Sequence, residues 1–157
     1  MGKEKNKSAT SLAGSLNTLL ASYQVMYFNV RAAHWMIKGE NFFELHKVFE
    51  TAYTEAAANI DEIAERILTL GAVPLLTGSE LLKRSQLKER SASGEESACI
   101  KQLHEDLSKL TGLEKEAVHL AEDSGDVVTA DLLTGYMAAQ QKTMWMLSQF
   151  LNRKSSI

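Results

Sequence analysis

Little in this 157-residue chain would interrupt a helix or link two segments covalently, because it holds one proline, nine glycines and one cysteine. The scarcity of proline and glycine favours long uninterrupted helices. The single Cys99 excludes a disulfide within the chain, fits a reducing cytoplasm and predicts a small core or surface residue. No apolar run approaches the roughly 20 residues that span a membrane, so we expect no membrane segment.

An excess of charge is also missing. The formal net charge is −3, so the chain is not a polycation and has no global signature of nucleic-acid binding. Positive charge clusters only near the two ends, at Lys3, Lys5, Lys7, Arg153 and Lys154. We expect residues 1–8 to form a flexible polar tail and residues 152–157 a C-terminal tail.

The remaining residues, 9–151, form one predicted domain. Apolar residues recur at helical spacing in four long segments, and no segment alternates as a strand does. The helices are expected over about 9–37, 41–70, 93–125 and 126–151, with a short helix near 79–86. Short turns predict two antiparallel hairpins, and the long middle connection can cross the bundle. The sequence thus predicts an all-α four-helix bundle with one crossover, as in ferritin-like folds.

Several residues predict where these helices begin and end. Asn41 with Glu44 and Ser93 with Glu96 have the spacing of capping boxes. Gly39 and Gly125 are expected to end the first and third long helices. Asp126 or Thr129 would then start the fourth.

Four polar residues of the second long helix have a symmetric spacing: His46, Glu50, Asp61 and Glu65. The outer pairs are each spaced i, i+4, and at about 100° per residue all four lie within an arc of roughly 100°. Glu50 and Asp61 are 11 residues apart, which is about 16 Å along a helix. They cannot hold one ion within a single chain.

A second, antiparallel copy of this helix would set Glu50 opposite the other copy's Asp61. The polar face lies roughly 130° from the apolar stripe of the same helix, and the small residues 56–58 at the centre of symmetry would let two helices approach closely. We predict a metal site shared between two identical subunits and present twice per dimer. The alternative is a solvated charged face whose spacing is accidental.

His34 lies within the apolar stripe of the first long helix, which by itself indicates a hydrogen-bonded core histidine. If the chain turns near residues 39–40, however, His34 packs beside residue 45 and reaches His46. One chain would then supply His34, His46 and Glu50, and the other Asp61 and Glu65. Two imidazoles and three carboxylates suit iron, with zinc or manganese as alternatives.

Other residues of these types are expected to be structural or exposed. The pair Glu116 and His119 has the spacing used in di-iron bundles, but it occurs once and lies off the apolar stripe, so we expect it to face solvent. His104 is predicted at the surface. Trp35 and Trp145 are expected to be packing residues, with a role for Trp35 in quenching oxidants as the alternative.

Several of these segments together resemble the Dps family, the DNA-binding proteins from starved cells or mini-ferritins. The similar segments are 34–46 (HWMIKGENFFELH), 61–66 (DEIAER) with the following Leu70, Gly71 and Pro74, 125–133 (GDVVTADLL) and 145–147 (WML). The resemblance extends from about residue 9 to residue 151. It implies a hollow shell of twelve subunits with di-iron ferroxidase sites at two-fold interfaces.

The resemblance also implies site residues. It places His34, His46, Glu50, Asp61 and Glu65 at the ferroxidase centre, although the family more often has Asp at the position of Glu50. It places Glu122, Asp126 and Asp131 in the region of an acidic iron-entry pore, where helix capping is the alternative role.

From the residues and the resemblance we expect a cytoplasmic ferroxidase, with association with the nucleoid as a further option. It would oxidise Fe(II) with hydrogen peroxide or dioxygen, store the product, and protect the cell and its DNA. Direct DNA binding is expected to be weak. The alternatives are a DNA-compacting protein in which iron oxidation is secondary, and a purely structural helical assembly.

Overall fold

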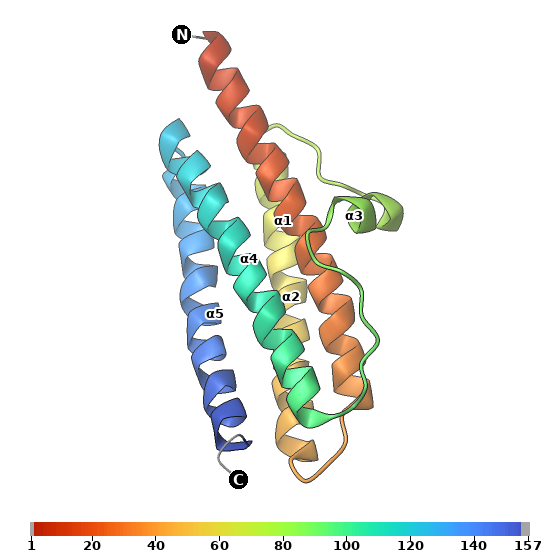
Figure 1. The fold of residues 1–157 in the computed structure, drawn as a ribbon. Helices are drawn as coiled ribbons and strands as arrows, with labels where there is room; N and C mark the ends of the chain where they lie inside the picture. Colours follow the sequence, from red (N-terminus) through yellow and green to blue (C-terminus); the bar gives the residue numbers. More distant parts are fainter. Residues whose placement is uncertain (1, 155–157) are drawn as a thin grey trace.

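The computed structural model describes the backbone of residues 2–154 and the side chains of residues 12–152. Within residues 2–154 it has five helices and no strand. They are α1 (Gly2–Met36), α2 (Phe42–Thr69), α3 (Gly78–Arg84), α4 (Glu96–Ser124) and α5 (Val127–Lys154). Four long helices form the bundle and α3 lies on the crossover beside α1 (Figure 1). The predicted fold class is confirmed.

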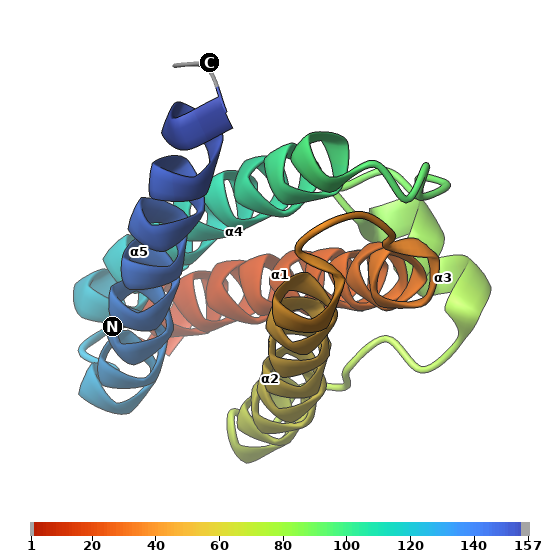
Figure 2. The same ribbon diagram turned by 90° about the horizontal axis from the view of Figure 1, so that it is seen from below.

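Helix α1 is the centre of the packing, because it contacts α2, α3 and α4, while α5 packs chiefly on α4. The α1–α2 turn and the start of α4 lie at the same end of the bundle (Figures 1 and 2). The core is aliphatic with one large aromatic from each of α1 and α2; its largest fully buried apolar side chains include Leu12, Leu16, Leu19, Tyr23, Phe49, Ile63, Ile67, Ile100, Leu103, Leu110 and Leu133. No helix in the described part of the chain is long and apolar enough to cross a membrane.

The first helix differs from its expected start near residue 9. It runs without a break from Gly2, so residues 2–8 are helical rather than a segment preceding the helix. No proline interrupts this stretch, and the backbone hydrogen bonds can therefore continue toward the N-terminus. The side chains of Lys3, Lys5 and Lys7, like those of Arg153 and Lys154, lie outside the described residues.

Both predicted capping boxes are wrong. Asn41 stands at the N-cap of α2 but makes no capping hydrogen bond through its side chain. At α4 the N-cap is Glu95, whose carboxylate accepts from the N–H groups of Ser97 and Ala98. A capping box does occur at α3, between Thr77 and the Glu80 side chain.

The helix ends are closer to expectation. Gly125 ends α4 in the left-handed conformation, with φ of 73°, which favours glycine. Asp126 then precedes α5 and accepts from the N–H of Thr129 at 3.0 Å, so its predicted capping role is confirmed. The short helix expected at 79–86 is found at Gly78–Arg84.

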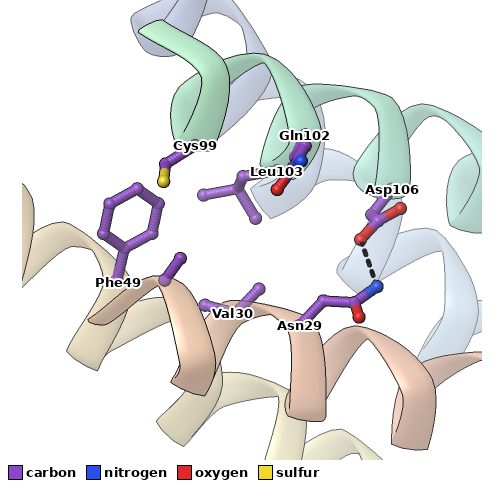
Figure 3. Close-up of a pocket in the computed structure, with 8 residues that line it drawn as sticks. Asn29, Val30, Phe49, Cys99, Gln102, Leu103 and Asp106 are labelled. Atoms are coloured by element: carbon purple, nitrogen blue, oxygen red, sulfur yellow. Dashed lines mark hydrogen bonds between the residues drawn. The ribbon is translucent and has the colours of Figure 1, made fainter. Parts of the chain in front are cut away.

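A buried polar contact holds the crossover against the bundle. Asp106 is 1% exposed and accepts from Asn29 at 3.1 Å and from Arg90 of the crossover at 2.6 Å. Figure 3 shows the Asn29–Asp106 contact at one end of a cavity of about 10 Å³ between α1 and α4, with Cys99 at the other end. That volume is at the lower limit for one water molecule. Cys99 is therefore a packed core residue, as one of its two expected roles allows.

A second buried polar group lies deeper, where all four long helices contribute. The Glu114 carboxylate is fully buried and accepts from the Tyr23 hydroxyl at 2.5 Å and from the Gln140 amide at 2.8 Å. Asn59 of α2 donates to the Tyr23 hydroxyl at 3.2 Å. The second carboxylate oxygen of Glu114 has no protein partner. Burial raises the pKa of Glu114 to about 7, even though the two hydrogen bonds oppose this shift.

The Glu114 carboxyl predicts a pH dependence of stability. Its pKa in the folded state is about 7, above its ordinary value of 4.5. The folded protein therefore binds this proton more tightly, and the stabilisation, complete below about pH 4.5, is lost as the pH rises through 7. Glu114→Gln should remove this loss, so from pH 5 to pH 8 the wild type should lose stability relative to the variant by about 1 kcal/mol or more.

Thermal or urea unfolding of both proteins across this range would measure the difference, with Glu116→Gln on the exposed side of α4 as the control. Parallel pH profiles for wild type and Glu114→Gln would contradict the assignment.

Candidate metal centre

Two histidines from neighbouring helices meet beside the α1–α2 turn. His34 lies in the last turn of α1, and His46 lies near the start of α2. Their rings stack with centroids 3.7 Å apart and planes 23° from parallel. The predicted contact between His34 and His46 is confirmed, because a turn of only five residues brings the two helices back alongside each other.

Each histidine also hydrogen-bonds to the other's backbone. His34 Nδ1 lies 2.9 Å from the carbonyl oxygen of His46, and His46 Nδ1 lies 3.0 Å from that of His34. A carbonyl oxygen can only accept, so both Nδ1 atoms carry a hydrogen. In the neutral rings this leaves Nε2 with a lone pair, which is the form in which imidazole binds a metal ion. Such hydrogen bonds are what usually orient a metal-binding histidine.

Aromatic rings enclose the histidine pair. Phe42 stacks on His46 with centroids 5.1 Å apart, and Tyr53 meets His34 edge-on at 5.2 Å. His34 itself is only 9% exposed. Sequence reasoning did not single out Tyr53, although its place two helical turns after His46 on α2 is a signal that could have done so.

Glu50 follows His46 by one helical turn and is half-exposed. Its carboxylate accepts from Lys47 at 2.9 Å, and the side chain is 42% exposed. The Lys47 hydrogen bond and charge lower the pKa of Glu50, with smaller contributions from the nearby His34 and His46. The carboxylate is therefore ionised at neutral pH, and it lies near both histidines.

Asp61 and Glu65 lie farther along the same helix and are exposed. Among the described residues, no three His, Cys, Asp or Glu side chains are close enough together to hold a metal ion. A single chain thus brings together His34 and His46, with Glu50 one turn away, and keeps the other two carboxylates apart from them. The exposed Ala57 and Ala58 lie between these groups, so small side chains cover this part of α2.

The residues expected near an entry pore have different surroundings. Asp126 is paired with Arg66 of α2 at 2.8 Å. Burial alone would raise the pKa of Asp126, but the hydrogen bonds from Thr129 and Arg66 lower it overall. Glu122 and Asp131 are both exposed, and Glu122 Oε2 lies 3.7 Å from His119 Nδ1. Asp126 is thus held by contacts with Arg66 and Thr129 of its own chain, whereas the side chains of Glu122 and Asp131 are exposed.

The remaining expectations give a mixed result. Glu116 and His119 are exposed, as predicted. His104 is instead half-buried, and its ring lies 3.3 Å from the Ser148 hydroxyl. The prediction that Trp35 and Trp145 pack within the chain is wrong, since they are 66% and 61% exposed. Their helical positions turn outward from the core, and the Arg31 guanidinium lies 4.9 Å from the Trp35 ring centroid.

Comparisons with known proteins agree with the fold. Residues 13–157 match the family model of the ferritin-like domain. The chain is 37% identical to DNA protection during starvation protein 2 of Bacillus anthracis, over 88% of this chain and 94% of that protein. It is 44% identical to an uncharacterized protein of Haemophilus influenzae, over 93% of this chain and 91% of the relative.

A solved structure is similar along most of its length. The Dps protein from Vibrio cholerae O1, described as a member of a broad superfamily of ferritin-like diiron-carboxylate proteins, is 42% identical with a TM-score of 0.89. The match covers 92% of this chain and 91% of that one. The four-helix bundle, the matched domain and these relatives together show that the chain belongs to the Dps family of ferritin-like proteins.

Proposed function

We propose that this protein oxidises Fe(II) and stores the Fe(III) product, at sites shared between two copies of the chain. The observation that carries the proposal is the His34–His46 pair, whose hydrogen bonds leave both Nε2 atoms as metal donors. One subunit would supply this pair and Glu50, and the other would supply Asp61 and Glu65.

The exposure of the carboxylates supports a shared site. Asp61 and Glu65 are exposed in the single chain and lie on the same side of α2 as His46 and Glu50. The symmetric spacing of the four residues sets each Glu50 opposite the partner copy's acidic pair when two α2 helices cross antiparallel. The small Ala57 and Ala58 beside the centre of symmetry would permit a close crossing.

The donor types support iron as the substrate. Imidazole nitrogen suits iron, zinc and copper, whereas carboxylate oxygen favours harder ions, so a mixed set with three carboxylates suits Fe(II), with zinc and manganese as competitors. The Vibrio cholerae relative is described as a ferritin-like diiron-carboxylate protein. Two Fe(II) ions would reduce one hydrogen peroxide with two protons to two waters, and each iron would become Fe(III). This paired oxidation avoids the one-electron step that releases hydroxyl radical.

Glu50 is the ligand that needs the largest adjustment. Its carboxylate is held by Lys47 at 2.9 Å, and it must turn from that partner to reach an ion at the histidines. Both side chains are largely or partly exposed, so the ion pair is weak and the adjustment costs little. Glu50 is therefore the proposed ligand of the second, more weakly held iron.

The proposed assembly is a shell of twelve subunits built from two-fold dimers, in the cytoplasm and near the nucleoid. Glu122 and Asp131, exposed near the α4–α5 turn, are the proposed entry-pore carboxylates, with Asp126 as their neighbour. Relatives named DNA protection during starvation proteins support a protective role toward DNA. The alternative, DNA compaction with iron oxidation secondary, needs a cationic surface that a net charge of −3 does not provide.

Removing either exposed carboxylate should disable iron oxidation without unfolding the protein. Asp61→Ala and Glu65→Ala should each slow Fe(III) formation with peroxide by at least about tenfold, because each loses a donor but no core packing. The rate is followed by absorbance, and assembly by size-exclusion chromatography. Glu55→Ala, an exposed carboxylate on the opposite side of α2, is the matched control. Wild-type rates in both variants would reject the site.

Mixing two inactive variants should restore part of the activity. Subunits with His46→Ala and subunits with Asp61→Ala each break every site in their own assemblies. In mixed dimers one of the two sites combines intact halves, so co-refolded assemblies should recover up to about a quarter of the wild-type rate if mixing is random. Mass spectrometry would establish the mixing. Mixed assemblies that stay inactive would place each site within a single chain.

Binding to duplex DNA should be weak at physiological salt, or should depend on the N-terminal residues. Twelve chains of charge −3 repel phosphate, so only multivalent contacts from the positive clusters at the two ends, Lys3, Lys5 and Lys7 with Arg153 and Lys154, could offset this repulsion. A gel-shift titration at several salt concentrations would compare the full chain with one beginning at residue 9. Tight binding by the shortened chain would contradict this expectation.

A further inference from the structure

We infer that Glu96, at the start of α4, is a positioning residue for the His34–His46 pair. This inference rests on the proposed function and concerns how the second hairpin holds the turn between α1 and α2. Glu96 is 55 residues from Asn41 in sequence, yet both of its carboxylate oxygens bind that residue. Glu96 itself lies outside the candidate metal ligands.

The contact has two hydrogen bonds. Glu96 Oε1 accepts from the backbone N–H of Asn41 at 2.8 Å, and Oε2 accepts from the Asn41 side-chain amide at 3.0 Å. Asn41 is the N-cap of α2 and its own side chain makes no cap. The Glu96 carboxylate therefore accepts the hydrogen bond of the backbone N–H of this N-cap residue. Without that carboxylate, the partly buried N–H would lose its acceptor.

The turn is shaped to fit this carboxylate. Gly39 has φ of 131°, and a Cβ at that position would lie 2.6 Å from Glu96 Oε1. On the other side Lys38 donates its backbone N–H to the Gly94 carbonyl at 3.1 Å. Gly94 also has a positive φ, of 79°, and a Cβ there would overlap the Met36 carbonyl oxygen. A side chain at Gly39 would clash with Glu96, and one at Gly94 would clash with the Met36 carbonyl. Either clash would push the turn away from the start of α4.

The burial of Glu96 makes the contact strong and specific. Its side chain is only 6% exposed, and a buried carboxylate must be compensated by hydrogen bonds or positive potential. Asn41 supplies two donors, and the first turn of α4, where Glu96 stands, supplies the positive end of a helix dipole. The helix dipole acts on Glu96 wherever the turn lies, but the two Asn41 donors are available only while the turn stays in place, so these hydrogen bonds favour this one position of the turn.

The position of the turn determines the register of the two histidines. His34 lies two residues before the end of α1, and His46 lies four residues after the start of α2. Their reciprocal hydrogen bonds, at 2.9 and 3.0 Å, require both helix ends to be fixed to within about 0.5 Å. Glu96 would provide that restraint from outside the α1–α2 hairpin.

A charge-swap series tests this inference. Asn41→Asp sets two carboxylates against each other and should loosen the turn. Glu96→Gln alone should stay close to wild type, because its Oε1 can still accept the Asn41 N–H and the Asn41 amide can turn its oxygen toward the new Nε2. In the double variant the new amide at position 96 can donate to the new carboxylate at position 41 and still accept its backbone N–H. The double variant should therefore recover the wild-type behaviour, which simple loss of packing would not allow.

The first readout uses the metal-free protein. Hydrogen–deuterium exchange at the histidine C2 carbon, measured on proteolytic peptides, reports each of the four histidines separately. Exchange at His34 and His46 should become several-fold faster in Asn41→Asp, stay near the wild-type rate in Glu96→Gln, and return to that rate in the double variant. His104 and His119 should stay unchanged, as should all four in Glu114→Gln, a matched buried carboxyl on the same helix.

The second readout is Co(II) affinity of the assembled protein, which should fall about tenfold in Asn41→Asp and recover in the double variant. Unchanged histidine exchange in Asn41→Asp, or no recovery in the double variant, would overturn the role of Glu96. If wild-type protein bound no Co(II), the proposed function would fail, while the histidine exchange would still decide whether Glu96 holds the turn.

Discussion

The reciprocal hydrogen bonds between two histidines and each other's backbone carbonyls tie α1 to α2 at the end of the bundle where the chain reverses. At 2.9 and 3.0 Å they occupy both Nδ1 atoms and one carbonyl on each helix. The same contacts therefore stabilise the hairpin and select the ring form that can bind a metal. Because the same atoms fix the hairpin and the ring form, the histidine half of the proposed site is already in place within a single chain.

Carboxylates in this chain divide into two groups with different physical surroundings. Glu96, Asp106 and Glu114 are almost fully buried, and each accepts from side chains or backbone of other helices or loops. Asp61 and Glu65 are exposed on α2. Exposed carboxylates keep their hydration and bring little stability to the fold, so they are free to serve as ligands. The buried ones are structural, and their desolvation is offset only while the helices remain in register.

The sequence predicted the helices and the histidine contact because both follow from regular geometry. A helix has a fixed rise and rotation, so the positions of His46, Glu50, Asp61 and Glu65 on one side of α2 follow from their numbers alone. The contact between His34 and His46 required only a short turn near Gly39. The cap of α2 could not be predicted in this way, because Asn41 finds its partner in Glu96, which is 55 residues away. A capping-box pattern describes only local contacts.

The burial of individual side chains was harder to predict than the helices that carry them. Glu114 was not among the residues predicted to face inward on α4, yet it is fully buried, and Tyr23 and Gln140 bring donors to it from α1 and α5. Trp35 was expected inside for the opposite reason, since large aromatic rings usually pack in cores, and it is 66% exposed. It directly follows His34, and because consecutive residues on a helix point about 100° apart, Trp35 turns away from the side of α1 that faces α2 while Ala33, on the other side of His34, is buried.

The two halves of the proposed site therefore differ in rigidity. The histidine half is enclosed by Phe42 and Tyr53 and fixed by backbone contacts. The carboxylate half is exposed and has room to move. A rigid half fixes where the first ion binds, and a mobile half can adjust as the charge on the iron changes from two to three. Since neither half is complete within one chain, the proposed oxidation would occur only in assembled protein, where the product can be stored.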